Sequence, residues 1–87
     1  MDASQRPRFG KGVKLRREDG GAAMLLVPEG ALELNAPAAA ALELVDGERT
    51  ISEIVEALVE KFDVAPSQAQ TEIDELFDRL AERGFLR

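Results

Sequence analysis

Hydrophobic and polar residues alternate in short segments over the first third of the chain, which is the pattern of β-strands. In residues 12–18, GVKLRRE, Val13 and Leu15 fall on one face and charged residues on the other. Residues 24–27, MLLV, are apolar on both faces, which favours the middle strand of a small sheet. Asp19-Gly20-Gly21 predicts a turn between these two strands, because glycine tolerates positive φ.

A third alternating segment follows a second predicted turn at Pro28-Glu29-Gly30. In residues 31–35, ALELN, the two leucines point inward, and Ala31 and Glu33 point outward. The three strands form an antiparallel meander whose third strand is unpaired along one side. Such an edge can accept a strand from another chain, so it is a candidate site for peptide capture.

The second half of the chain shows helical periodicity in three segments. The first helix is capped by Asn35, carries Pro37 in its first turn and is expected to end at Gly47, in the left-handed conformation. Its core-facing stripe consists of Ala38, Ala41, Leu42 and Val45.

The second and third helices have clear start signals. Residues 50–53 have the T-x-x-E form of a capping box, and hydrophobic residues follow at helical spacing as far as Phe62. Pro66 opens the third helix and Gly84 ends it, after which Phe85 and Leu86 are expected to fold back onto the core. The apolar positions of the third helix are Ala69, Ile73, Leu76, Phe77 and Leu80.

Three strands followed by three helices predict an α+β domain with a winged helix-turn-helix-like fold. A length of 87 residues suits one domain, residues 1–87, in which we expect residues 1–7 to be flexible. The second apolar face of residues 24–27 must be shielded from water. The sequence leaves two possibilities: the N-terminal arm covers it, with Phe9 as a lid, or a second copy of the chain covers it in a homodimer.

The composition argues against an enzyme. The chain has no Cys, His, Trp or Tyr, which removes thiolate nucleophiles, imidazole bases and the usual soft-metal ligands. We therefore expect no catalytic residue, no metal site and no cofactor. Glu53, Glu56 and Glu60 recur at helical spacing, but a solvated helix face explains them better than a hard-metal site does.

The apolar runs are too short to cross a bilayer, since the longest are residues 22–27 and 36–42. The sequence has no apolar signal core and no Arg-rich transit pattern at its start, so we expect no membrane association and a cytoplasmic location.

Charge is distributed unevenly along the chain. Residues 1–21 carry six Lys/Arg against three Asp/Glu (+3), and residues 22–87 carry five against fourteen (−9), which together give the net charge of −6. The third helix holds five acids against two arginines, so a winged-helix DNA-binding regulator is a weak alternative and no nucleic acid is expected as a partner. Neither Ser52 nor Ser67 lies in the D-S-L-like motif of an acyl or peptidyl carrier.

Residues 28–63, PEGALELNAPAAAALELVDGERTISEIVEALVEKFD, resemble the signature of the PqqD family, the peptide chaperones of pyrroloquinoline quinone biosynthesis. Members of that family typically read P-E-G-x-x-x-L-N and then D-G-x-x-T/S-x-x-E-I. The start P-R-x-x-x-G-V-x-L is also present here, so the resemblance extends from about Arg8 to Leu86. One departure is Ala36-Pro37, where the family usually has N-x-T.

The resemblance implies a non-catalytic peptide chaperone. Members of the family bind the precursor peptide PqqA and present it to the radical SAM enzyme PqqE, which cross-links a Glu and a Tyr of that peptide. In related precursor-peptide recognition elements the peptide adds a strand to the third strand, in a groove bounded by the third helix. Here those elements are residues 31–34 and 67–83. A recognition element for another modified peptide is the alternative.

Helical geometry suggests which side chains select the peptide. With Leu76 at the centre of the core stripe, Phe77, Gln70 and Ala81 lie on one shoulder, and Arg79 or Arg83 on the other can meet an acidic side chain. Periodicity leaves open which shoulder faces the groove, and whether Phe77 simply completes the core. The candidate peptide-binding residues are Ala31, Leu32, Glu33, Leu34, Gln70, Ile73, Phe77, Arg79, Leu80 and Ala81.

Overall fold

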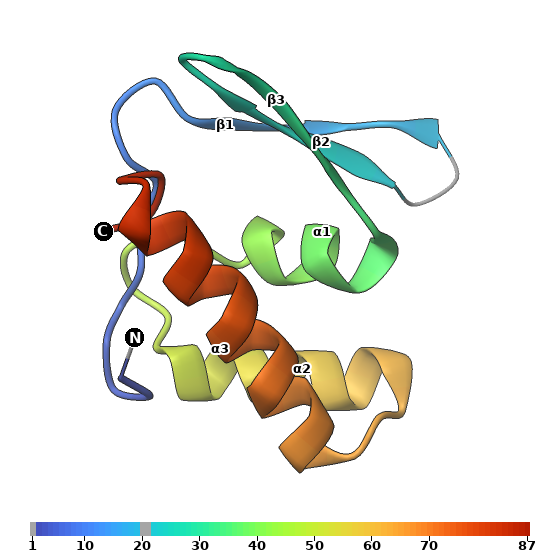
Figure 1. Cartoon of the computed structure of the whole chain (residues 1–87). Coiled ribbons are helices and arrows are strands. Elements are labelled where there is room, and N and C mark those ends of the chain that lie inside the picture. Colours follow the sequence, from blue (N-terminus) through green and yellow to red (C-terminus); the bar gives the residue numbers. More distant parts are fainter. Residues whose placement is uncertain (1, 20–21) are drawn as a thin grey trace.

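The computed structural model describes residues 2–19 and 22–87 and has three strands followed by three helices (Figure 1). The strands are β1 (Lys14–Arg17), β2 (Ala23–Val27) and β3 (Gly30–Leu34), in the antiparallel order β1-β2-β3. The helices are α1 (Ala36–Glu43), α2 (Ile51–Phe62) and α3 (Pro66–Glu82). The predicted α+β fold class and the middle position of β2 are confirmed; of the predicted turn at residues 19–21, Gly20 and Gly21 lie outside the described residues.

The sheet forms one layer and α1 lies directly beneath it; α2 lies farther below, and α3 runs obliquely from the level of α2 up to the level of α1 (Figure 1). Leu25 of β2 pairs with Leu15 and Leu32, and this set of side chains faces the helices, with Leu25 fully buried. Residues 39–42 of α1 are all buried, since three alanines and a leucine let the helix approach the sheet closely. The inward-facing positions predicted for the strands are therefore confirmed.

Helix α1 begins as predicted but ends early. The Asn35 side chain accepts a hydrogen bond from the Ala38 N–H at 2.9 Å, and proline occupies the first turn. The helix stops at Glu43, because the next amides bond carbonyls three residues back and tighten the last turn. Gly47 has a positive φ of 79°, but it lies in the following loop and its N–H binds the Pro7 carbonyl at 2.9 Å. The prediction that Gly47 ends the helix was wrong.

Helices α2 and α3 have the ends that the sequence indicates. Thr50 Oγ1 accepts from the Glu53 N–H at 3.1 Å, and Glu53 Oε1 accepts from the Thr50 N–H at 2.8 Å, which completes the capping box. At the end of α3, Gly84 (φ 79°) donates to the Ala81 carbonyl, and the next amide reaches back to Leu80 at 2.9 Å. This is a Schellman motif, and it returns the buried Phe85 and Leu86 to the core.

The capping box predicts a pH dependence of stability. Hydrogen bonds from the backbone N–H and the hydroxyl of Thr50 lower the pKa of Glu53 below its ordinary value of 4.5. A lowered pKa in the folded state means that the stabilisation is complete above pH 4.5 and is lost as the pH falls through the lowered value. Glu53→Gln should therefore differ from the unmodified chain in free energy of unfolding more at about pH 7 than at about pH 3.

Urea unfolding at the two pH values measures this difference. Glu56→Gln is the matched control, because Glu56 lies on the same helix and, among the described residues, makes no hydrogen bond or ion pair. An effect of Glu53→Gln that is equal at both pH values would contradict the prediction.

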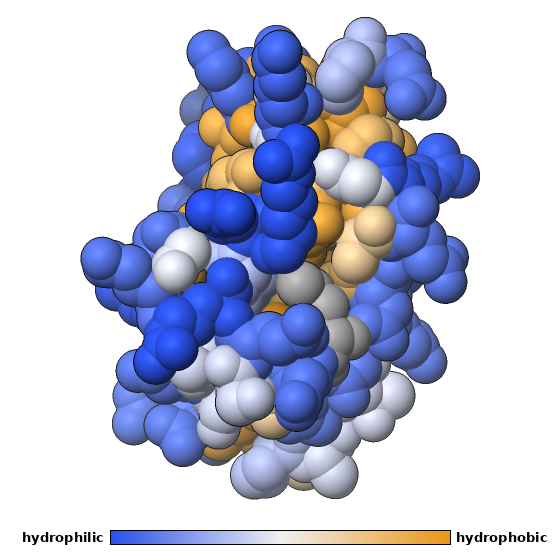
Figure 2. All heavy atoms as spheres, turned by 90° about the vertical axis from the view of Figure 1, so that its left-hand side faces the viewer, coloured by the Kyte–Doolittle hydropathy of each residue, from blue (hydrophilic) through white to orange (hydrophobic). Residues whose placement is uncertain are grey.

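The N-terminal arm, residues 2–10, runs along the helices and pairs with the C-terminal segment (Figure 1). Arg8 and Arg87 exchange backbone hydrogen bonds of 3.0 and 2.8 Å, and the Gly10 N–H binds the Phe85 carbonyl at 2.8 Å. A Cβ at Gly10 would lie 2.2 Å from the Gly84 oxygen, so only glycine permits this approach. On the face that includes the chain ends, apolar atoms gather toward the sheet and hydrophilic side chains surround and cross them (Figure 2).

The arm does not cover the outer face of the sheet. Phe9 forms a bridge with Leu86 and packs against the core, so the prediction that it is a lid over residues 24–27 was wrong. Met24 and Leu26 remain half-buried on the outer face, and the homodimer stays a prediction. The flexibility of residues 1–7 also stays a prediction, although the carbonyls of Ala3 and Gln5 accept hydrogen bonds from the first amides of α2. Within the described chain, no helix has the length and hydrophobicity needed to cross a membrane.

Candidate functional site

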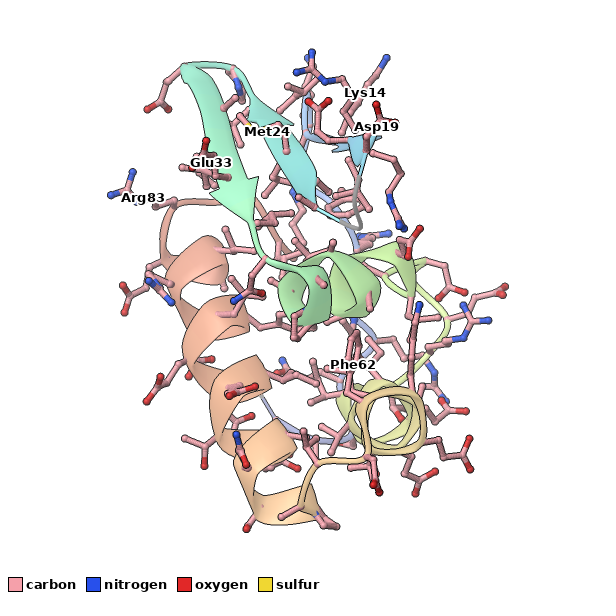
Figure 3. All side chains as sticks on the ribbon, turned by 90° about the vertical axis from the view of Figure 1, so that its right-hand side faces the viewer. Lys14, Asp19, Met24, Glu33, Phe62 and Arg83 are labelled. Carbon is pink, nitrogen blue, oxygen red and sulfur yellow. The ribbon has the colours of Figure 1, made fainter. Side chains whose placement is uncertain are left out.

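A groove of about 560 Å³ lies between β3 and α3. In both ribbon views β3 and α3 slant in the same direction, and the C-terminal half of α3 lies nearest the strand (Figures 1 and 3). The residues that line the groove are Leu32, Glu33, Leu34, Asn35, Pro37, Ala38, Ala41, Leu58, Glu72, Ile73, Glu75, Leu76, Arg79, Leu80 and Arg83.

The bottom of the groove is apolar and its walls carry charges. Apolar side chains come from β3, from the first two turns of α1, from Leu58 of α2 and from α3. Glu33 stands on the strand side, and Arg83 projects from the end of α3 beside that strand (Figure 3). An extended peptide could bury alternate side chains in such a channel and keep its polar ones at the rim.

Strand β3 supplies one wall and an open edge. It pairs with β2 on one side only, because the sheet order places it last. Leu32, Glu33 and Leu34 line the groove, as the sequence suggested. Ala31 pairs opposite Leu26, and its side chain is exposed outside the groove.

Helix α3 presents its Leu76 side to the groove. Leu76 is half-buried and lines the groove together with Ile73, Arg79 and Leu80, whereas Phe77 is 0% exposed and belongs to the core. The prediction that the Phe77 ring lines the groove was wrong. The centre of the buried stripe lies between Ile73 and Leu80 rather than at Leu76, which places the phenylalanine inside and the leucine at the edge.

Two other predicted residues lie on the side of α3 away from the groove. Gln70 donates a hydrogen bond to the Asp74 carboxylate at 2.9 Å on the same helix, and Ala81 is half-buried. Neither lines the groove, so their assignment to it was also wrong. The shoulder of α3 that faces the groove is the one that carries Arg79 and Arg83.

Sequence reasoning missed the bottom of the groove and its acidic residues. Pro37, Ala38 and Ala41 of α1, and Leu58 of α2, were interpreted only as helix-forming and core residues. Their exposure to the groove depends on how the helices cross, and no local signal contains that information. The acids Glu72 and Glu75 could have been found, because they flank Leu76 at helical spacing.

Charges along the groove wall of α3 are segregated. Glu72 and Glu75 lie toward its N-terminal end, and Arg79 and Arg83 toward its C-terminal end, which is the end beside β3. Within residues 2–19 and 22–87, no three carboxylates converge in a way that could hold a metal ion. The arrangement therefore offers shape, backbone hydrogen bonds and charge to a ligand.

These features define a small α+β domain with an open edge strand beside a groove, and comparison with known proteins gives its family. Residues 22–86 match the family model described as coenzyme PQQ synthesis protein D (PqqD). The "PqqA binding protein" of Xanthomonas axonopodis pv. citri is 31% identical over 83 residues, which cover 94% of this chain and 90% of that protein. The chain belongs to the PqqD family, and the resemblance inferred from the sequence is confirmed.

A longer relative contains a similar unit. The bifunctional coenzyme PQQ synthesis protein C/D of Methylorubrum extorquens is 34% identical over 87 residues, covering 99% of this chain but only 23% of the relative. The solution structure of the PqqD part of Methylobacterium extorquens PqqCD, a stand-alone recognition element for ribosomally synthesised and modified peptides, superimposes with a TM-score of 0.83. Identity to it is 33%, and the match covers 100% of this chain and 94% of that one.

A more distant structure shares the fold alone. TbiB1 in complex with the TbiA(beta) leader peptide has a TM-score of 0.77 at 18% identity, and the match covers 92% of this chain and 94% of that chain.

Proposed function

We propose that this chain is a non-catalytic recognition element that binds the precursor peptide PqqA. The single observation that carries the proposal is the open edge of β3 beside the groove. Family membership supports the choice of peptide, because the relative from Xanthomonas axonopodis is named for binding PqqA. A recognition element for another modified peptide would use the same groove.

We propose that PqqA binds as an added strand on β3. Val27 and Gly30 flank the two-residue turn, so they are the pair that the turn hydrogen bond joins. Hydrogen-bonded and non-hydrogen-bonded pairs alternate along an antiparallel ladder, so Ala31 and Glu33 should turn their N–H and C=O groups outward. A guest strand that pairs there directs every second side chain toward Leu76 and the bottom of the groove.

The bound peptide is then presented to the radical SAM enzyme PqqE, in the cytoplasm. Strand addition suits this task, since it fixes one segment of a flexible peptide and leaves the rest of the peptide available to the enzyme. The chain supplies binding and positioning, and PqqE supplies the chemistry.

Titration of isotopically labelled protein with synthetic PqqA tests the proposal. Amide resonances of residues 31–35 and of the groove side of α3, around Leu76 and Arg79, should shift together as peptide is added. The amides of Ser52, Glu56 and Glu60, which are exposed residues of α2 outside the groove, serve as the internal control. Absence of binding, or shifts confined to α1 and α2, would overturn the proposal.

A further inference from the structure

The two basic residues near the end of α3 both lie on the groove wall. Arg79 and Arg83 are the only Lys or Arg residues between Pro66 and Gly84, in a region where acids predominate. Both line the groove at its C-terminal end, where none of the acids of α3 lines it, because Glu72 and Glu75 line the other end and Asp74, Asp78 and Glu82 lie outside the groove. Both cations of α3 thus lie together at the end of the groove that is beside β3.

These two guanidinium groups have no carboxylate partner in the part of the chain that the structure describes. Some other arginines do: Arg16 pairs with Glu18 at 2.7 Å, Arg17 pairs with Glu43, and Arg49 pairs with Asp46 at 2.9 Å. An arginine offers a planar set of donors that matches a carboxylate, and charge-assisted hydrogen bonds of this kind are stronger than neutral ones. The pair therefore offers donors of the kind that bind an acidic side chain.

The spacing along α3 matches the repeat of an extended guest. Same-face side chains of a strand recur every ~6.6 Å, whereas the helix rises ~1.5 Å per residue. The midpoint between Arg79 and Arg83 is thus ~7.5 Å along the axis from Leu76, close to one two-residue step of a strand. If one side chain of the guest strand packs on Leu76, the next side chain on the same face therefore lies near the two arginines.

We propose that Arg79 and Arg83 determine specificity by binding a carboxylate of the guest strand, two residues away from an apolar side chain that packs on Leu76. This inference rests on the proposed function, because it assumes that a peptide pairs with β3. The recognised ligand is an extended peptide segment that reads apolar-x-acidic or acidic-x-apolar, depending on whether the guest strand runs parallel or antiparallel to β3.

A structural role for the arginines makes a different prediction. Basic residues near a helix C-terminus stabilise the helix dipole by a few tenths of a kcal/mol. In that case their replacement would alter stability slightly and leave peptide affinity unchanged. Affinity and its salt dependence therefore separate the two roles.

The experiment compares Arg79→Gln/Arg83→Gln with Arg49→Gln/Lys61→Gln by isothermal titration calorimetry with synthetic PqqA. Both double variants remove two positive charges, but Arg49 and Lys61 lie outside the groove. We expect the groove variant to bind about tenfold more weakly, with a shallower dependence on salt, and the control to bind as the unmodified chain does. The affinity of Arg79→Lys/Arg83→Lys for PqqA should lie between those of the groove variant and the control. Lysine keeps the positive charge but lacks the planar guanidinium group that binds a carboxylate through two hydrogen bonds.

Replacing each Asp and Glu of the peptide in turn by its amide completes the test. One such replacement should weaken binding to the unmodified chain about tenfold and have no further effect on the groove variant. Equal affinities of both double variants, with binding by the unmodified chain intact, would overturn the inference alone. If the unmodified chain does not bind PqqA, the proposed function itself fails. Thermal unfolding of each variant confirms that it is folded.

Discussion

Replacement of Phe77 by alanine is expected to lower the free energy of unfolding by about 3–5 kcal/mol. The ring is fully buried in the core, so its removal leaves a cavity that neighbouring side chains fill only in part. Leu76→Ala is the matched change one residue earlier. It should cost about 1 kcal/mol or less, because Leu76 is half-buried at the groove, and it should weaken PqqA binding several-fold.

Urea unfolding and calorimetric titration of the two variants measure this contrast. The two residues are adjacent and both are apolar, so a difference between them reports their orientation and not the local helix propensity. A Phe77→Ala protein that keeps its stability and loses peptide affinity would show that the ring lies at the groove after all.

Proline at Glu33 is expected to weaken PqqA binding by about tenfold or more. Proline has no N–H, and its ring occupies the edge where a guest strand would approach. The pairing with β2 should survive, since the Glu33 N–H points away from it, and the loss of stability should stay near 1 kcal/mol.

Glu33→Ala is the control, because it removes the same carboxylate but retains the N–H. Affinities from the same titration separate the side chain from the backbone group. Strand addition on β3 would be ruled out if the proline and alanine variants bound PqqA equally well.

The sequence predicted the features of the fold that are encoded locally. The capping box at Thr50 and Glu53, the Asn35 cap and the Pro66 start each depend on residues within three or four positions, and all three are present. The alternation that makes β3 a half-buried strand is equally local. Propensity and hydrogen-bonding chemistry suffice for such features.

The side of α3 that faces the groove could not be predicted in this way. Phe77 and Leu76 are adjacent apolar residues, and periodicity accepts either one as the centre of the core stripe. The choice between them depends on where α2 and the sheet pack, which is a property of the whole domain. The same reason explains why Pro37 and Leu58 were not recognised as groove residues.

Local sequence features also could not predict that the N-terminal arm pairs with the C-terminal segment. Phe9 as a lid over residues 24–27 was one of the two covers that the sequence left open. Its actual neighbour, Leu86, is far along the chain, and the glycine that permits the approach, Gly10, has no distinctive local context.

That pairing also bears on the order of folding. Arg8 can find Arg87 only after the intervening strands and helices have collapsed, because closing so long a loop early costs entropy that no local contact repays. The pairing of the arm with the C-terminal segment is therefore expected to form late in folding. The groove residues take no part in that pairing, so a chain whose arm has not yet docked should already present both β3 and α3 to a guest.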